Sequence, residues 1–159
     1  MDWGFEEKAK RLAIAIIDYS RKGLENHQAG LKLHDLAHIY WMTRDLPWLQ
    51  SQQVRYTREL SRLMGTRDAT SFLLPKERYC GDISTRVHSL SVESKAWRAL
   101  RDWQPVLRAL NEDELLSKIS SYEREYYPKL MEAVMGSIRR ETETPFIPIA
   151  LLDLYLIHI

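Results

Sequence analysis

Three histidines in the first quarter of the chain are the first side chains whose spacing could support chemistry. His27, His34 and His38 recur at intervals of seven and four, so they share one stripe of an α-helix, next to Asp35. Imidazoles are zinc ligands, but seven helical residues separate His27 from His34 by about 10 Å along the axis. Only His34 and His38 could share an ion, and no downstream Cys or Glu-x-x-His pattern supplies further ligands. We therefore expect no metal site and no cofactor.

Two short motifs in this region resemble parts of known enzyme families. The string Leu33-His34-Asp35-Leu36-Ala37-His38 resembles the metal-binding His-Asp signature of HD-domain phosphohydrolases. That family also has a separate His well upstream, and no His precedes His27 here. Arg21 and His27, with five residues between them, are similar to the Arg-x(4–6)-His motif of HEPN ribonucleases, small helical proteins that act on RNA. The resemblances imply an alternative function, that of a small helical ribonuclease or a His-based metal hydrolase.

Arginines form the second group of side chains with recognisable spacing. Residues 44–108 hold twelve basic and seven acidic side chains, whereas residues 109–159 hold five and nine, so the middle of the chain is basic. Arginine suits bidentate contacts with phosphate, and basic side chains interleaved with aromatic ones are typical of proteins that follow a nucleic-acid backbone. The arginines in helical register or close to Trp97 and Trp103 are the predicted nucleic-acid contacts: Arg55, Arg58, Arg62, Arg98, Arg101 and Arg108. The alternative is that they are ordinary solvated helix faces.

Apolar residues recur at spacings of three and four along the first half of the chain, which predicts α-helices. The first helix is expected over about 2–24, with an apolar face made of Phe5, Ala9, Leu12, Ile16, Ser20 and Leu24. The second, about 28–45, is expected to bury Ala29, Leu33, Leu36, Ala37 and Tyr40, and Pro47 ends it or opens the next element. The third, about 49–64, is expected to bury Val54 or Tyr56 with Leu60, Leu63 and Met64.

A long ordered loop over 65–81 separates these helices from two more in the second half. Asp82 is an expected N-cap for a helix that reaches about Trp103 and buries Ile83, Val87, Leu90 and Trp97, and Pro105 permits a new helical turn. Asn111, followed by three acidic residues, is an expected N-cap for a last long helix to about 138. Pro128 is expected to kink that helix.

The last segment, 148–159, is apolar on nearly every side and is expected to dock as a helix or a strand. The side chains predicted to bind a protein partner or a second copy of the chain are Leu151, Leu154, Tyr155 and Ile157. The alternative is that the segment closes the chain's own core.

Composition places the whole chain in one class. A length of 159 residues, with 45% hydrophobic and 28% charged side chains, predicts a single globular domain over 1–159. We expect an all-α fold, a bundle of five to six helices with one long ordered loop. Cys80 is the single cysteine, which excludes an internal disulfide and suits a reducing compartment. No secretion signal or bilayer-length apolar run is present, so we expect a cytoplasmic protein.

The expected function follows from surfaces more than from catalytic motifs. No Gly-rich phosphate loop, Gly-x-Ser-x-Gly elbow or Cys and His pair at helical spacing occurs in the sequence. We therefore expect a noncatalytic helical interaction module, or a small subunit of a multi-protein assembly. A protein partner or homo-oligomer is expected, no membrane contact is expected, and nucleic acid is left open as a further partner.

Overall fold

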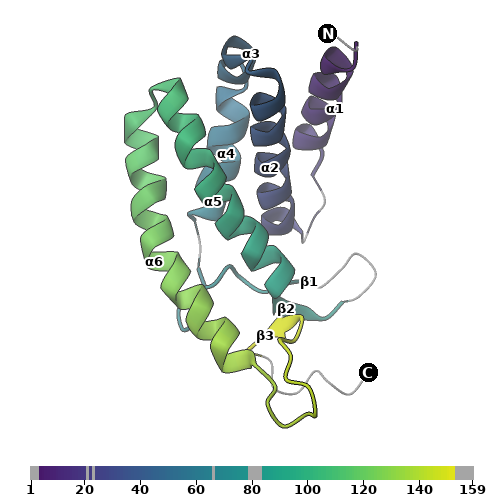
Figure 1. Cartoon of the computed structure of the whole chain (residues 1–159), viewed down its shortest axis with the longest axis vertical. Coiled ribbons are helices and arrows are strands. Elements are labelled where there is room, and N and C mark those ends of the chain that lie inside the picture. Colours follow the sequence, from purple (N-terminus) through teal and green to yellow (C-terminus); the bar gives the residue numbers. More distant parts are fainter. Residues whose placement is uncertain (1–3, 21, 23, 66, 79–83, 153–159) are drawn as a thin grey trace.

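A computed structural model describes residues 4–20, 22, 24–65, 67–78 and 84–152, which form a helical bundle with a small sheet at one end (Figure 1). Within these residues the helices are α1 (Glu6–Asp18), α2 (Glu25–Thr43), α3 (Leu46–Gln50), α4 (Gln53–Leu63), α5 (Leu90–Leu110) and α6 (Asp113–Ser137). The strands are β1 (Glu77–Arg78), β2 (Arg86–Ser89) and β3 (Ala150–Leu151). The predicted all-α bundle with a long loop is confirmed.

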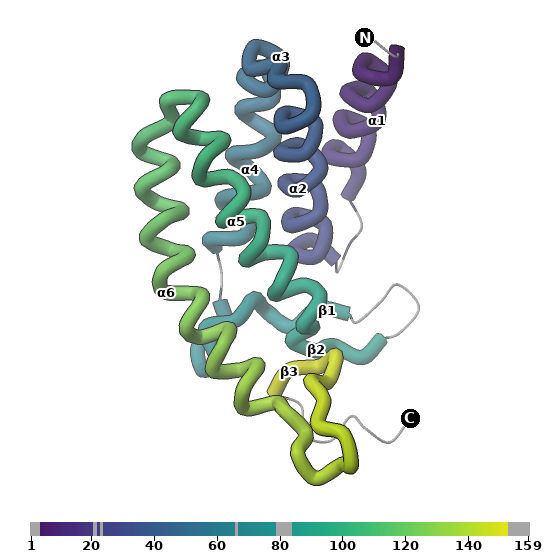
Figure 2. Tube along the Cα trace, viewed as in Figure 1, coloured from purple at the N-terminus to yellow at the C-terminus, as the bar shows by residue number. Residues whose placement is uncertain are grey.

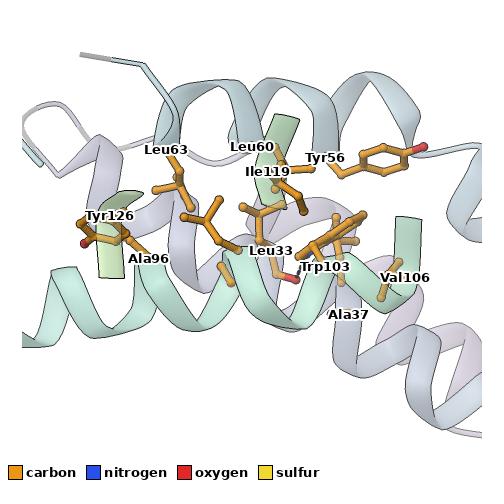
Figure 3. Close-up of a cluster of buried hydrophobic side chains, with 14 of the residues drawn as sticks. Leu33, Ala37, Tyr56, Leu60, Leu63, Ala96, Trp103, Val106, Ile119 and Tyr126 are labelled. Carbon is orange, nitrogen blue, oxygen red and sulfur yellow. Dashed lines mark hydrogen bonds between the residues drawn. The ribbon is translucent and has the colours of Figure 1, made fainter. Parts of the chain in front are cut away.

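The core lies where α2, α4 and α5 meet around Trp103 (Figure 3). Trp103 is fully buried, its indole Nε1 donates a hydrogen bond of 2.8 Å to the Leu33 carbonyl oxygen, and its ring centroid lies 4.8 Å from that of Tyr56. Gly30 lets α2 approach α5 closely, because a Cβ added there would lie 3.1 Å from the Lys95 carbonyl carbon. One indole therefore joins three helices, and the expected core face of the second helix, Ala29 to Tyr40, is buried as predicted.

The sheet lies at the end of the bundle where α5 begins and α6 finishes (Figure 2). β2 is the central strand and pairs antiparallel with both neighbours, with Glu77 opposite Val87 and His88 opposite Leu151. Leu151 is fully buried in the core. The apolar end of the chain therefore docks as a strand at Ala150–Leu151 and closes the chain's own core there, while Leu154, Tyr155 and Ile157 lie outside the described residues.

The prediction of which face of the first helix is buried is wrong. Phe5 and Leu12 are 65% and 62% exposed, and α1 instead packs through Ala13, Ile17 and the stem of Lys10. Lys10 can face inward because its ammonium group lies 2.5 Å from Asp45 and 2.6 Å from Glu6, and the hydrogen bond to Asp45 raises the pKa of Lys10. The helix also stops at Asp18, six residues before the predicted end.

Several helices also begin or end at residues other than the predicted ones. Residues 86–89, expected in a helix, form β2, and α5 begins at Leu90 and continues through Pro105 without a break. Asn111 is not an N-cap: its left-handed backbone (φ 58°) ends α5, a conformation that asparagine tolerates well. Pro47 opens the short α3, whose N-cap Asp45 accepts a 3.0 Å hydrogen bond from the Trp48 amide. Asp82 lies outside the described residues.

Among the described helices, none combines the length and the apolar character that a membrane span requires.

Candidate phosphate-binding pocket

A charged cavity of about 600 Å³ opens between the start of α2, the second half of α4 and the segment that carries β1 and β2. Its lining includes four basic side chains, Arg58, Arg62, Lys76 and Arg86, and two acidic ones, Glu25 and Glu77. The other lining residues that the structure describes are Asn26, Ser61, Gly65 and Pro75. We refer to this cavity as the basic pocket.

Helix α4 brings Arg58 and Arg62 to the basic pocket because they lie one turn apart on the side away from its buried residues. The opposite side of α4 buries Tyr56, Leu60 and Leu63, which fixes the rotation of the helix. The third predicted arginine, Arg55, is held outside the pocket by a bidentate pair with Asp18, at 2.9 and 2.6 Å. The hydrogen bond from Arg55 lowers the pKa of Asp18.

Glu59 is a buried carboxylate that lies next to the basic pocket. Its side chain is only 2% exposed, and it lies 2.8 Å from Arg58, 3.6 Å from Arg62 and 3.7 Å from the ammonium of Lys32. Lys32 is also buried, and this burial lowers its pKa although Glu59 is close. A side cavity of about 130 Å³ opens here, and it shares Arg58, Arg62 and Glu25 with the basic pocket. One buried carboxylate therefore holds three cations.

Glu77 joins the far wall of the basic pocket to α2. Its carboxylate oxygens accept hydrogen bonds from the amides of Asn26, at 2.7 Å, and His27, at 3.1 Å, which lie in the first turn of α2. These amides have no partner within the helix, so Glu77 caps α2 from β1, about fifty residues further along the chain. Burial raises the pKa of Glu77 against the effect of the two hydrogen bonds. The cap keeps Lys76 beside the start of α2.

A third buried carboxylate, Glu93, anchors the loop that leads into this wall. Glu93 accepts a 3.1 Å hydrogen bond from the Leu74 amide and another from the hydroxyl of Tyr126. The guanidinium of Arg67 stacks over the Tyr126 ring, 4.4 Å from its centroid. Burial raises the pKa of Glu93 to about 7. Because Leu74 lies two residues before Lys76, Glu93 helps to position the pocket wall.

The predicted arginines of α5 lie apart from the basic pocket. Arg98 pairs with Asp102 at 2.9 Å, Arg101 lies over the Trp97 ring at 5.1 Å from its centroid, and Arg108 is exposed in the last turn of the helix. A second cavity, of about 370 Å³, is lined by Leu31, His34, Ser94, Lys95, Trp97 and Arg98. The described linings of the two cavities share no residue, so the six predicted arginines form two separate groups.

The structure places the histidines on α2 but does not gather them into one site. The His34 ring contacts the His38 ring, with centroids 3.8 Å apart and planes tilted by 50°, and Nδ1 of His34 lies 3.7 Å from the Asp102 carboxylate. His27 is half-buried, and that burial lowers its pKa. Within the described part of the chain, no group of three or more His, Cys, Asp and Glu side chains could hold a metal ion. Arg21 of the HEPN-like motif lies outside the described residues.

The sequence pattern does not mark the pocket residues that lie outside the arginine stripes. Lys76 and Arg86 come from a loop and a short strand, where no helical period marks them. No local pattern marks Glu59 and Lys32 as buried, and only the packing of α2 against α4 shows that they are buried together. One usable signal was the excess of basic over acidic residues in the middle of the chain.

Comparison of the chain with known protein families, with curated proteins and with solved structures finds no match.

Proposed function

We propose that the protein is a noncatalytic nucleic-acid-binding module that works as a small subunit of a larger assembly, and that the basic pocket contacts phosphate. The observation that carries the proposal is the convergence of Arg58, Arg62, Lys76 and Arg86 on one cavity from a helix, a loop and a strand. Like charges repel, and Glu59 offsets only the part of this repulsion that comes from Arg58 and Arg62, so an anionic ligand would lower the remaining cost in free energy.

The charges around the basic pocket support an anionic ligand. In the described part of the lining, four basic side chains face two carboxylates, and one of these, Glu77, already accepts two amide hydrogen bonds. The guanidinium groups of Arg58 and Arg62 are partly exposed beside the pocket, and guanidinium groups form paired hydrogen bonds with phosphate oxygens. Arg101 and Trp97 on α5 offer a cation next to an aromatic ring, and we place a secondary strand contact there.

The test is the affinity of the protein for a fluorescein-labelled single strand of twenty nucleotides, as DNA and as RNA, measured by anisotropy over a range of salt concentrations. We expect binding that weakens as salt rises. The double variant Arg62→Gln with Arg86→Gln removes one cation from each side of the basic pocket. It should bind about tenfold more weakly and lower the salt slope by about 1.4, the value for two single-strand phosphate contacts.

The matched control loses the same two charges elsewhere. Arg124→Gln with Arg140→Gln alters exposed arginines outside the basic pocket and should bind like the unaltered protein. Absence of binding at 50 mM salt, or equal weakening by the two double variants, would overturn the proposal.

A further inference from the structure

We infer that the basic pocket accepts a phosphomonoester, the terminal phosphate of a strand or of a nucleotide, in preference to the internal diesters of a strand. The inference rests on the proposed function and names the part of the ligand that enters the cavity. Its basis is that the cations surround one cavity instead of following a line across the surface.

The shape of the lining favours the end of a chain. An internal phosphate continues into a nucleotide on both sides, so its binding site needs an open path in two directions. Glu77 joins β1 to the start of α2 along one wall of the basic pocket, because both of its oxygens bind amides in the first turn of α2. On the α4 side the wall is formed by Arg58, Ser61 and Arg62, and both arginines form ion pairs with the buried Glu59. A terminal group can enter such a cavity without a continuing strand.

The charge of the lining also favours a phosphomonoester over a diester. Among the residues that the structure describes, the lining holds four basic and two acidic side chains, a difference of two positive charges. A phosphomonoester has a second pKa of about 6 and carries a charge of roughly −1.5 to −2 at neutral pH, whereas a diester carries only one negative charge. The monoester also presents three terminal oxygens, and the lining offers donors on Arg58, Arg62, Asn26 and Ser61. The pocket therefore matches the dianion better than the monoanion.

The experiment compares three single strands of identical sequence, each with fluorescein on an internal thymidine: one with a 5′-phosphate, one with a 3′-phosphate and one with neither. Anisotropy at pH 7.5 should show at least one phosphorylated strand binding about tenfold more tightly than the unphosphorylated one. Unlabelled AMP should compete with that strand. The preference should shrink between pH 7.5 and pH 5.5, where the monoester takes up its second proton.

The variants separate this inference from the proposed function. In the double variant Arg62→Gln with Arg86→Gln the preference for the phosphorylated end should disappear, whereas the double control Arg124→Gln with Arg140→Gln should keep it. If all three strands bind equally and the pocket variant weakens all of them, the pocket takes internal phosphates: the inference is overturned and the proposed function stands. If AMP binds and no strand does, the monoester class stands with a free nucleotide as its source, and the nucleic-acid function is overturned. Binding of neither overturns both.

Discussion

The two faces of α4 differ in chemistry: one buries apolar side chains and the other carries charged ones. One face buries Tyr56, Leu60 and Leu63 against the apolar core around Trp103. The other carries Arg58 and Arg62 around the buried carboxylate of Glu59. Removing apolar surface from water stabilises the fold by roughly 25 cal/mol per Å², whereas burying a charge costs free energy that its partners only partly return.

Under the proposed function, this difference separates the face that supports the fold from the face that we expect to bind an anion. The apolar face is complete within the chain, because the side chains of α2, α4 and α5 fill it. The charged face keeps an open cavity, and the described part of its lining holds more cations than carboxylates. Stability should therefore depend most on the first face, and affinity for anions on the second.

The largest expected loss of stability comes from Trp103→Ala. The change removes a fully buried indole together with its hydrogen bond to Leu33, so the free energy of unfolding should fall by about 4 kcal/mol. Urea denaturation followed by circular dichroism measures this loss. Trp103→Phe keeps an aromatic ring and should lose less than half as much. A loss below about 1 kcal/mol for Trp103→Ala would show that the core does not centre on this side chain.

Glu59→Gln should lower the stability of the protein and raise its affinity for anions. Without the carboxylate, the buried Lys32 loses its anionic partner, and unfolding should become easier by about 3 kcal/mol. Arg58 and Arg62 lose the same partner, so the basic pocket becomes more positive and should bind a phosphorylated strand more tightly. Urea denaturation and anisotropy on the same sample test both effects. Weaker binding by a folded Glu59→Gln protein would contradict the division between the two faces.

Glu93 should make stability depend on pH. Its pKa is raised to about 7 in the folded state from about 4.5, so the folded protein binds more protons between these values. The resulting stabilisation is fully present below the unfolded pKa and is lost as pH rises through 7. Relative to Glu93→Gln, the unaltered protein should lose about 2.5 kcal/mol between pH 5 and pH 8. If the difference in unfolding free energy between the unaltered protein and Glu93→Gln is the same at pH 5 and at pH 8, the raised pKa is contradicted.

The smallest effect concerns the cap at the pocket wall. Glu77→Ala removes the acceptor for the amides of Asn26 and His27 and should destabilise the protein by about 1 kcal/mol. Glu77→Gln keeps one carbonyl oxygen and should recover part of that loss. Thermal unfolding of the two variants measures the difference. Equal unfolding temperatures for Glu77→Ala and the unaltered protein would show that the cap does not contribute.

The long helices could be predicted from the sequence because their periodic faces coincide with burial. Leu33, Leu36 and Tyr40 recur on one side of α2 and are all buried. The same rule failed for α1, where small Ala13 and ion-paired Lys10 make the contact and the larger Phe5 and Leu12 stay exposed. A period identifies a helix, but which of two apolar faces is buried depends on the neighbouring element.

The candidate pocket could be predicted only in part. Arg58 and Arg62 stand out because they share one helix face, and the structure places both in the lining. Lys76 and Arg86 reach the same cavity through the antiparallel pairing of β1 with β2, a long-range contact that no local pattern encodes. The roles of Glu59 and Glu77 depend on burial and on hydrogen bonds that form only when distant segments meet.

The most direct test of the basic pocket is to map the binding site by ¹H–¹⁵N correlation spectra during titration with a 5′-phosphorylated single strand. Chemical shifts should change most at Asn26, Ser61, Lys76 and Arg86, which line the pocket on four different segments. Largest changes at Ser94, Trp97 and Arg98 instead, with the basic pocket unaffected, would contradict the account.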